Sequence, residues 1–242
     1  TVGSPFVILP KGLKFEFPKV PENNYVDTLV NKKLRDLRIA PSELCTDEAF
    51  IRRLYVDVTG LLPTVEEYDR FLKNPATNKR EQLVDELLAR KEFAELWVMK
   101  WAELLQIRSS NQVSYKATLL YYTWLQDKIS RNVPVNEWVQ ELLGASGGTF
   151  KNPATNYYQN ETDILKVSEN VAQVFMGMRI QCAQCHNHPF THWKQTEYWG
   201  LAQFFYKVNV SNPRAAKDGG TISLSEEGKI NRKINNLPEA AK

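Results

Sequence analysis

Hydrophobic and polar positions follow a helical period along most of the chain from about residue 24 onward. Apolar residues that recur every three or four positions are typical of amphipathic helices. Helix boundaries are marked by Thr46 and Thr64, which can cap N-termini, and by Pro41, Gly60 and Gly144, which end helices. The pattern predicts an all-α fold class, with helices over residues 24–40, 47–59, 65–73, 79–90, 92–107, 115–131, 136–143, 163–180 and 196–205.

Both ends of the chain depart from this pattern. Residues 1–22 hold four prolines among β-forming residues, and proline removes backbone donors, so they predict an extended Pro-rich N-terminal arm with an edge strand. Residues 209–242 turn polar and predict a C-terminal tail, either a linker or the truncated start of a following region. The predicted organisation is therefore an arm (1–22), a multi-helix domain (23–208) and a tail (209–242).

One stretch inside the helical domain is rich in glycine and asparagine. Residues 144–162 predict a long loop, and they contain the pair Tyr157-Tyr158. Loops of this length inside a compact domain are usually functional or mobile.

Length and charge narrow the function classes. A chain of 242 residues buries roughly 70–75% of its unfolded surface and needs no metal merely to fold, so a cofactor would be functional. The net charge of +3 is spread evenly and lacks the clustered basic face typical of nucleic-acid binding. No apolar run reaches about 18 residues, which predicts no membrane span in this chain.

Candidate chemistry is concentrated in residues 182–193, which hold two of the three cysteines and all three histidines. Cys182-x-x-Cys185-His186 has the spacing of a c-type haem attachment site. In this interpretation the two thiols form thioethers with the porphyrin and His186 is the proximal axial ligand of the iron. The aromatic side chains predicted to wall the pocket are Phe190 and Trp193, and the distal-ligand candidates are His188, His192 and Met178.

Two other interpretations of the same residues stay open. A tetrahedral zinc or iron site could use Cys182 and Cys185 with two of the histidines His186, His188 and His192. Alternatively, the cysteines form a redox pair or a simple disulfide, although a thioredoxin-like site would need a βαβ context that the helical pattern does not offer.

Several stretches together resemble a known family. They are residues 54–64, 93–101, Trp124 with 131–134, 182–190 and 193–205. Over about residues 25–208 the chain is similar to the planctomycete cytochrome-like domain of unknown function, found in large secreted multidomain proteins. The resemblance implies haem c on Cys182, Cys185 and His186, a periplasmic or extracellular location, and neighbouring domains of a larger exported protein as partners.

The predicted function is a c-type haem-binding domain that carries electrons within a larger exported protein to an unidentified redox partner. The interpretation favours an electron-transfer domain over a self-sufficient enzyme, because no catalytic constellation is recognisable. One alternative is a haem oxidoreductase with an open iron position, covered by the 144–162 loop and its tyrosines. The other is a non-enzymatic interaction module whose Cys/His cluster binds zinc.

Overall fold

The computed structural model describes residues 8–9, 12, 14–110, 113–211 and 219–225. Parts of the predicted arm and of the predicted tail lie outside the described residues. The chain divides into two compact units, Thr1–Arg53 and Leu54–Lys242, with the boundary inside one helix. Within the described ranges there is no helix long and apolar enough to cross a membrane.

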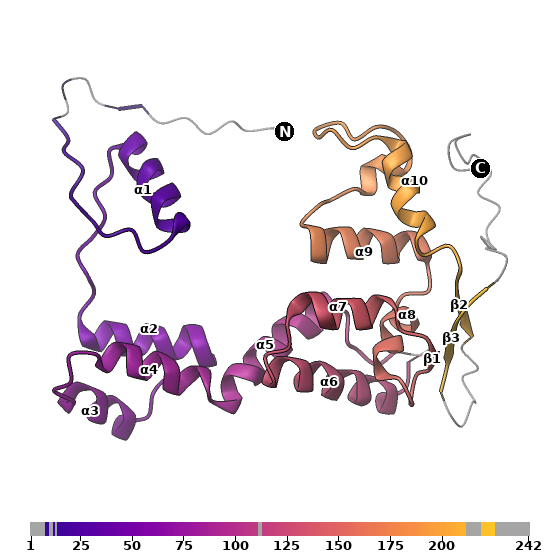
Figure 1. Cartoon of the computed structure of the whole chain (residues 1–242), viewed down its shortest axis with the longest axis horizontal. Coiled ribbons are helices and arrows are strands. Elements are labelled where there is room, and N and C mark those ends of the chain that lie inside the picture. Colours follow the sequence, from indigo (N-terminus) through magenta and orange to yellow (C-terminus); the bar gives the residue numbers. More distant parts are fainter. Residues whose placement is uncertain (1–7, 10–11, 13, 111–112, 212–218, 226–242) are drawn as a thin grey trace. The chain divides into compact units, whose positions relative to one another are not determined.

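The predicted all-α class is confirmed, since helices make up most of the described chain and strands very little (Figure 1). The α-helices are α1 (Tyr25–Leu37), α2 (Asp47–Thr59), α3 (Val65–Lys73), α4 (Lys79–Leu88), α5 (Lys91–Leu104), α6 (Tyr115–Ser130), α7 (Val135–Leu143), α8 (Asn156–Asn160), α9 (Ile164–Met176) and α10 (Gln195–Gln203). The remaining elements are two 3₁₀ helices, η1 (Pro153–Thr155) and η2 (Gln181–Gln184), and three strands, β1 (Gly147–Gly148), β2 (Val208–Ser211) and β3 (Thr221–Leu224).

The largest error in a predicted helix boundary concerns α9. The apolar stripe predicts a helix over residues 163–180, but α9 ends at Met176. Gly177 caps it in the left-handed conformation, with φ of 67°, which glycine adopts without the steric cost of a Cβ. The chain therefore leaves the helix four residues earlier than predicted and approaches Cys182 as a turn.

In the first unit, Glu22 organises the contact between the arm and α1. Its carboxylate accepts hydrogen bonds from Thr28 Oγ1 at 2.9 Å and Asn31 Nδ2 at 3.1 Å, and it pairs with Arg35 at 3.4 Å. The Arg35 guanidinium also lies 4.5 Å from the ring centroid of Phe17. Residues 14–22 form no strand, so the predicted edge strand is wrong for this described part of the arm.

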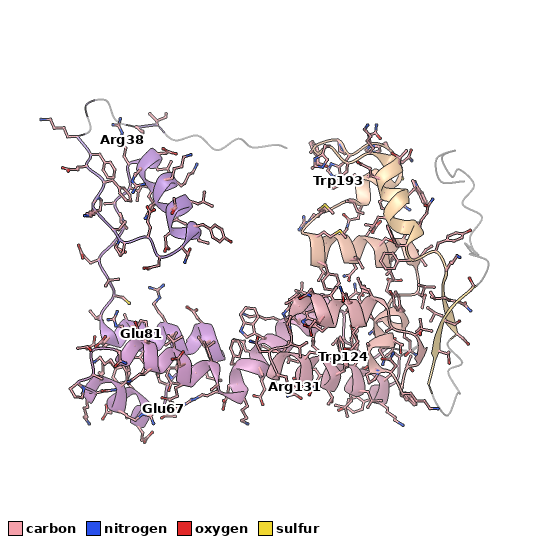
Figure 2. The ribbon with its side chains drawn as sticks, in the orientation of Figure 1. Arg38, Glu67, Glu81, Trp124, Arg131 and Trp193 are labelled. Atoms are coloured by element: carbon pink, nitrogen blue, oxygen red, sulfur yellow. The ribbon has the colours of Figure 1, made fainter. Side chains whose placement is uncertain are left out.

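The core of the second unit is built around aromatic side chains from α5, α6, α7 and α9. The Trp138 ring lies edge-on to Trp101 at 5.0 Å, Phe175 at 6.2 Å and Trp124 at 6.4 Å between ring centroids. Edge-to-face aromatic pairs add about 0.5–1.5 kcal/mol beyond the area they bury. Phe175 belongs to α9, so this cluster fixes the helix that leads to the cysteines; Figure 2 labels Trp124 within it.

The predicted polar tail contains a strand instead of a linker at residues 221–224. β3 pairs antiparallel with β2 on one side and with β1 on the other, giving the order β1-β3-β2. Ile222 is 2% exposed and joins the hydrophobic core. Four residues with one buried side chain give too weak a pattern for sequence prediction. Gly219, with φ of 81°, lets the backbone that leads into β3 pass close to Thr149, because a Cβ at this position would lie 2.4 Å from Thr149 Oγ1.

The 144–162 stretch is packed structure that contains β1, η1 and α8. Tyr157 and Tyr158 are 4% and 2% exposed. The Tyr158 hydroxyl donates to Leu143 O at 2.6 Å, and the Tyr157 hydroxyl donates to Asn170 Oδ1 at 2.9 Å. Burial raises the pKa of Tyr158 to about 12. Both rings lie in the core, and Tyr158 is also among the residues that line an apolar groove, so the cover of an iron site by these tyrosines stays a prediction.

Glu67 joins the start of α3 to Arg90, which immediately precedes α5. Its carboxylate accepts the Thr64 N–H at 2.8 Å in a capping box and forms an ion pair with Arg90. Burial opposes ionisation, but the Thr64 N–H and the Arg90 guanidinium outweigh it and lower the pKa of Glu67. The stabilisation is therefore complete above the ordinary pKa of a glutamate and is lost as the pH falls through the lower folded-state pKa.

We expect Glu67→Gln to lower the free energy of unfolding by about 1 kcal/mol at pH 7, because it removes a charge-assisted hydrogen bond. The difference from the wild type should shrink in acid, where Glu67 of the wild type is itself protonated. Urea unfolding at several pH values measures this. Glu66→Gln, at an exposed position in the same helical turn, is the control, and an equal loss in both variants would contradict the prediction.

Candidate functional site

The cysteines lie on the short 3₁₀ helix η2 and its C-cap, between α9 and α10. Ala183, between the two cysteines, is fully buried and packs with Ile180, Tyr198 and Trp199. Cys182, within η2, and Cys185, its C-cap, are both exposed, and both are free thiols. The predicted disulfide is therefore not formed in this structure.

His186 follows directly and is exposed. Its Nδ1 lies 2.7 Å from Asn187 O. Because a carbonyl oxygen can only accept, Nδ1 carries the proton, and in the neutral imidazole the lone pair is on Nε2. Ligating histidines usually donate their other ring N–H in this way.

Asn187 and Gln195 connect this turn to α10. Asn187 Oδ1 accepts the backbone N–H of Gln195, the first residue of α10, at 3.0 Å. The side-chain Nε2 of Gln195 donates to Gln184 O at 3.1 Å. These two bonds hold the backbone on both sides of Cys185 and His186. The spacing of Asn187 and Gln195 in the sequence carries no signal for such bonds.

His188 has the opposite tautomer. Its Nδ1 accepts the backbone N–H groups of Phe190 and Thr191, both at 3.2 Å, so the neutral ring carries its proton on Nε2. Its own backbone N–H donates to Trp193 O at 2.8 Å and closes the loop. As a distal ligand His188 would have to give up two hydrogen bonds, so the structure favours a structural role for this residue.

The other predicted site residues are divided between surface and core. His192 is exposed and its ring lies 4.4 Å from that of Trp193 between centroids. Trp193 is half-buried against the cluster around Ala183, on the loop before α10 (Figure 2). Met178 packs against the same cluster, whereas Phe190 is 75% exposed.

An apolar groove of about 630 Å³ lies elsewhere in this unit, and neither Phe190 nor Trp193 lines it. It is formed by α7, α9, α10 and the sheet, with Phe204 and Leu224 among its walls. The pocket role predicted for Phe190 and Trp193 therefore stays a prediction.

A hydrogen bond between a buried tyrosine and a half-buried glutamate links the two helices that flank the turn. Tyr198 of α10 is 1% exposed and donates its hydroxyl to Glu169 Oε1 of α9 at 2.9 Å. Burial and the Glu169 carboxylate raise the pKa of Tyr198 far above its ordinary value. In the sequence Tyr198 is one of several apolar residues of a helix, and no spacing pairs it with Glu169. The hydrogen bond between Tyr198 and Glu169 therefore links α9 and α10, the helices on either side of the turn.

The chain matches a known protein family. The family PSCyt2, described as a protein of unknown function (DUF1549), matches residues 25–210. The chain belongs to this family. The PSCyt2 region extends from α1 to β2, so it contains the complete turn with Cys182, Cys185 and His186, and it ends before β3. No curated protein and no solved structure was found to match the chain.

The donors in this PSCyt2 turn differ in how well they suit a tetrahedral zinc ion and a haem. Within the described ranges, no three His, Cys, Asp or Glu side chains are gathered as a metal-ion site. A tetrahedral zinc site that used His188 would have to break the bonds at its Nδ1. A zinc site that used His186 and His192 instead would leave these bonds in place. Two exposed thiols followed directly by His186, with its Nδ1 bonded to Asn187 O, are also compatible with a porphyrin.

Proposed function

We propose that this chain is a cytochrome-like domain that binds haem c and carries electrons within a larger exported protein. One observation carries the proposal: Cys182 and Cys185 present exposed, free thiols, and the next residue, His186, has its Nδ1 hydrogen-bonded to Asn187 O, so that the lone pair of its neutral ring is on Nε2. Three donors of this kind in sequence are those that covalent haem attachment needs.

The residues would act as follows. Cys182 and Cys185 would hold the haem through thioether bonds, each made by adding S–H across one vinyl double bond, with the hydrogen going to the neighbouring carbon and without net oxidation. His186 would supply Nε2 as a ligand of the iron. Haem, when bound, supplies an iron that takes up and releases one electron. The buried Ala183, together with Tyr198 and Trp199, would keep the turn rigid during that exchange.

Location and partners follow from the same chemistry. Haem is attached covalently on the extracytoplasmic side of bacterial membranes, so the proposal includes export to the periplasm or beyond. It also includes the planctomycete multidomain setting that the sequence resemblance implies, in which neighbouring domains of the same protein, or an unidentified redox partner, exchange electrons with this one.

Expression of the full chain in a host with haem-maturation machinery tests the proposal. We expect a coloured protein with a Soret band, and a haem that stays with the polypeptide after acid–acetone extraction. A colourless product from such a host would overturn the proposal. Metal analysis that gave about one equivalent of zinc and no iron would support the zinc-binding interaction module instead.

One observation favours a haem oxidoreductase with an open iron position as the second candidate. His188 is engaged through Nδ1, and Met178 packs into the cluster around Ala183, so two of the three distal candidates do not stand ready to bind iron, and the exposed His192 is the third. Carbon monoxide added to the reduced protein separates the two functions. A shift of the absorption spectrum would favour the oxidoreductase, and an unchanged spectrum would favour two strong axial ligands and electron transfer.

A further inference from the structure

We infer that Asn187 is the positioning residue for His186 and couples its imidazole to the first turn of α10. The inference rests on the proposed function, because the orientation of His186 matters for a bound iron. Asn187 uses both of its oxygens. Its backbone oxygen accepts from His186 Nδ1 at 2.7 Å, and its side-chain Oδ1 accepts the Gln195 N–H at 3.0 Å.

The bond to Gln195 gives a partner to a backbone N–H that the helix itself leaves unpaired. The first N–H groups of a helix have no partner inside the helix and need an external acceptor. Gln195 is the first residue of α10, and Asn187 supplies that acceptor from eight residues earlier in the chain. α10 is itself fixed, because Tyr198 and Trp199 are 1% and 5% exposed in the cluster beneath the turn.

The anchored Asn187 determines which ring nitrogen of His186 carries the proton. Because the Asn187 peptide is held, its carbonyl oxygen stays in line with His186 Nδ1 and selects the tautomer with the proton on that nitrogen. An imidazole free in water prefers the other tautomer. The turn therefore presents Nε2 as a lone-pair donor before any iron arrives. Partners of this kind usually change metal affinity or activity by about 10–100-fold when removed.

Nuclear magnetic resonance of the histidine side-chain nitrogens in the full chain without haem tests this directly. In the wild type we expect His186 with its proton on Nδ1, and His188 with its proton on Nε2 as an internal control. Asn187→Ala should shift His186 toward the other tautomer and leave His188 unchanged. Asn187→Asp should restore the wild-type pattern, because a carboxylate oxygen also accepts the Gln195 N–H.

A second pair of variants removes the other partner of the same bond. Gln195→Pro deletes the backbone N–H, and proline is well tolerated at the first position of a helix. Lys194 already has the extended backbone required before proline, with φ of −88° and ψ of 156°. Gln195→Ala keeps the N–H and removes only the side-chain bond to Gln184. We expect Gln195→Pro to behave as Asn187→Ala, and Gln195→Ala to keep the wild-type tautomer.

The haem-loaded protein gives the second readout. External imidazole should displace His186 at about tenfold lower concentration in Asn187→Ala and Gln195→Pro, and at the wild-type concentration in Asn187→Asp and Gln195→Ala.

Two results would overturn the inference: a His186 with its proton on Nε2 in the wild type, or a tautomer that none of the four variants changes. If the wild type takes up no haem, the proposed function fails, while the haem-free spectra still decide whether Asn187 holds His186.

Discussion

Cys182→Ala combined with Cys185→Ala should abolish covalent haem attachment while the helical fold is retained. The two thioethers are the only proposed bonds between haem and polypeptide that would survive acid. Both side chains are exposed, so their truncation removes little packing. We expect the free energy of unfolding of the haem-free chain to change by no more than about 0.5 kcal/mol. Intact-protein mass and acid–acetone extraction measure the attachment.

Cys45→Ala is the matched control. Cys45 is half-buried in the first unit and precedes α2, far along the chain from η2. This variant should keep its haem in full. Haem that stayed bound through extraction in the double variant, or was lost in Cys45→Ala, would show that the attachment residues are not those of η2.

Trp138→Ala should destabilise the second unit by about 3–5 kcal/mol, the usual cost of truncating a large buried aromatic residue. Trp138 is 2% exposed and contacts rings from three other helices, those of Trp101, Trp124 and Phe175. A cavity at this point would also loosen α9, which leads to Cys182. Urea unfolding followed by far-ultraviolet circular dichroism measures the loss without depending on tryptophan fluorescence.

Trp97→Ala provides the comparison for the same chemical change. Trp97 is 37% exposed, and its ring centroid lies 6.2 Å from that of Phe93 and 4.6 Å from the Lys100 ammonium. We expect a loss of about 1 kcal/mol. A loss as large as that of Trp138→Ala would mean that the core of the second unit does not centre on Trp138.

The donors of the candidate site could be read from the sequence, but their arrangement could not. Cys182, Cys185 and His186 stand out because soft ligands are rare elsewhere in the chain. The opposite tautomers of His186 and His188 depend on which backbone groups the fold brings to each ring, namely Asn187 O and the N–H groups of Phe190 and Thr191. Such bonds are made at a loop whose shape is set by packing, and they leave no periodic signal.

The sequence by itself determined the all-α class, the position of each long helix and the chemistry concentrated at residues 182–193, because helical periodicity and capping are local properties. Only the tertiary structure decided that the 144–162 stretch belongs to the core, that Ile222 completes a small sheet, and that Gln195 holds Asn187. Each of these depends on contacts between residues distant in the chain, whose free energy comes from burial and hydrogen bonding between elements and not from the preferences of any one segment.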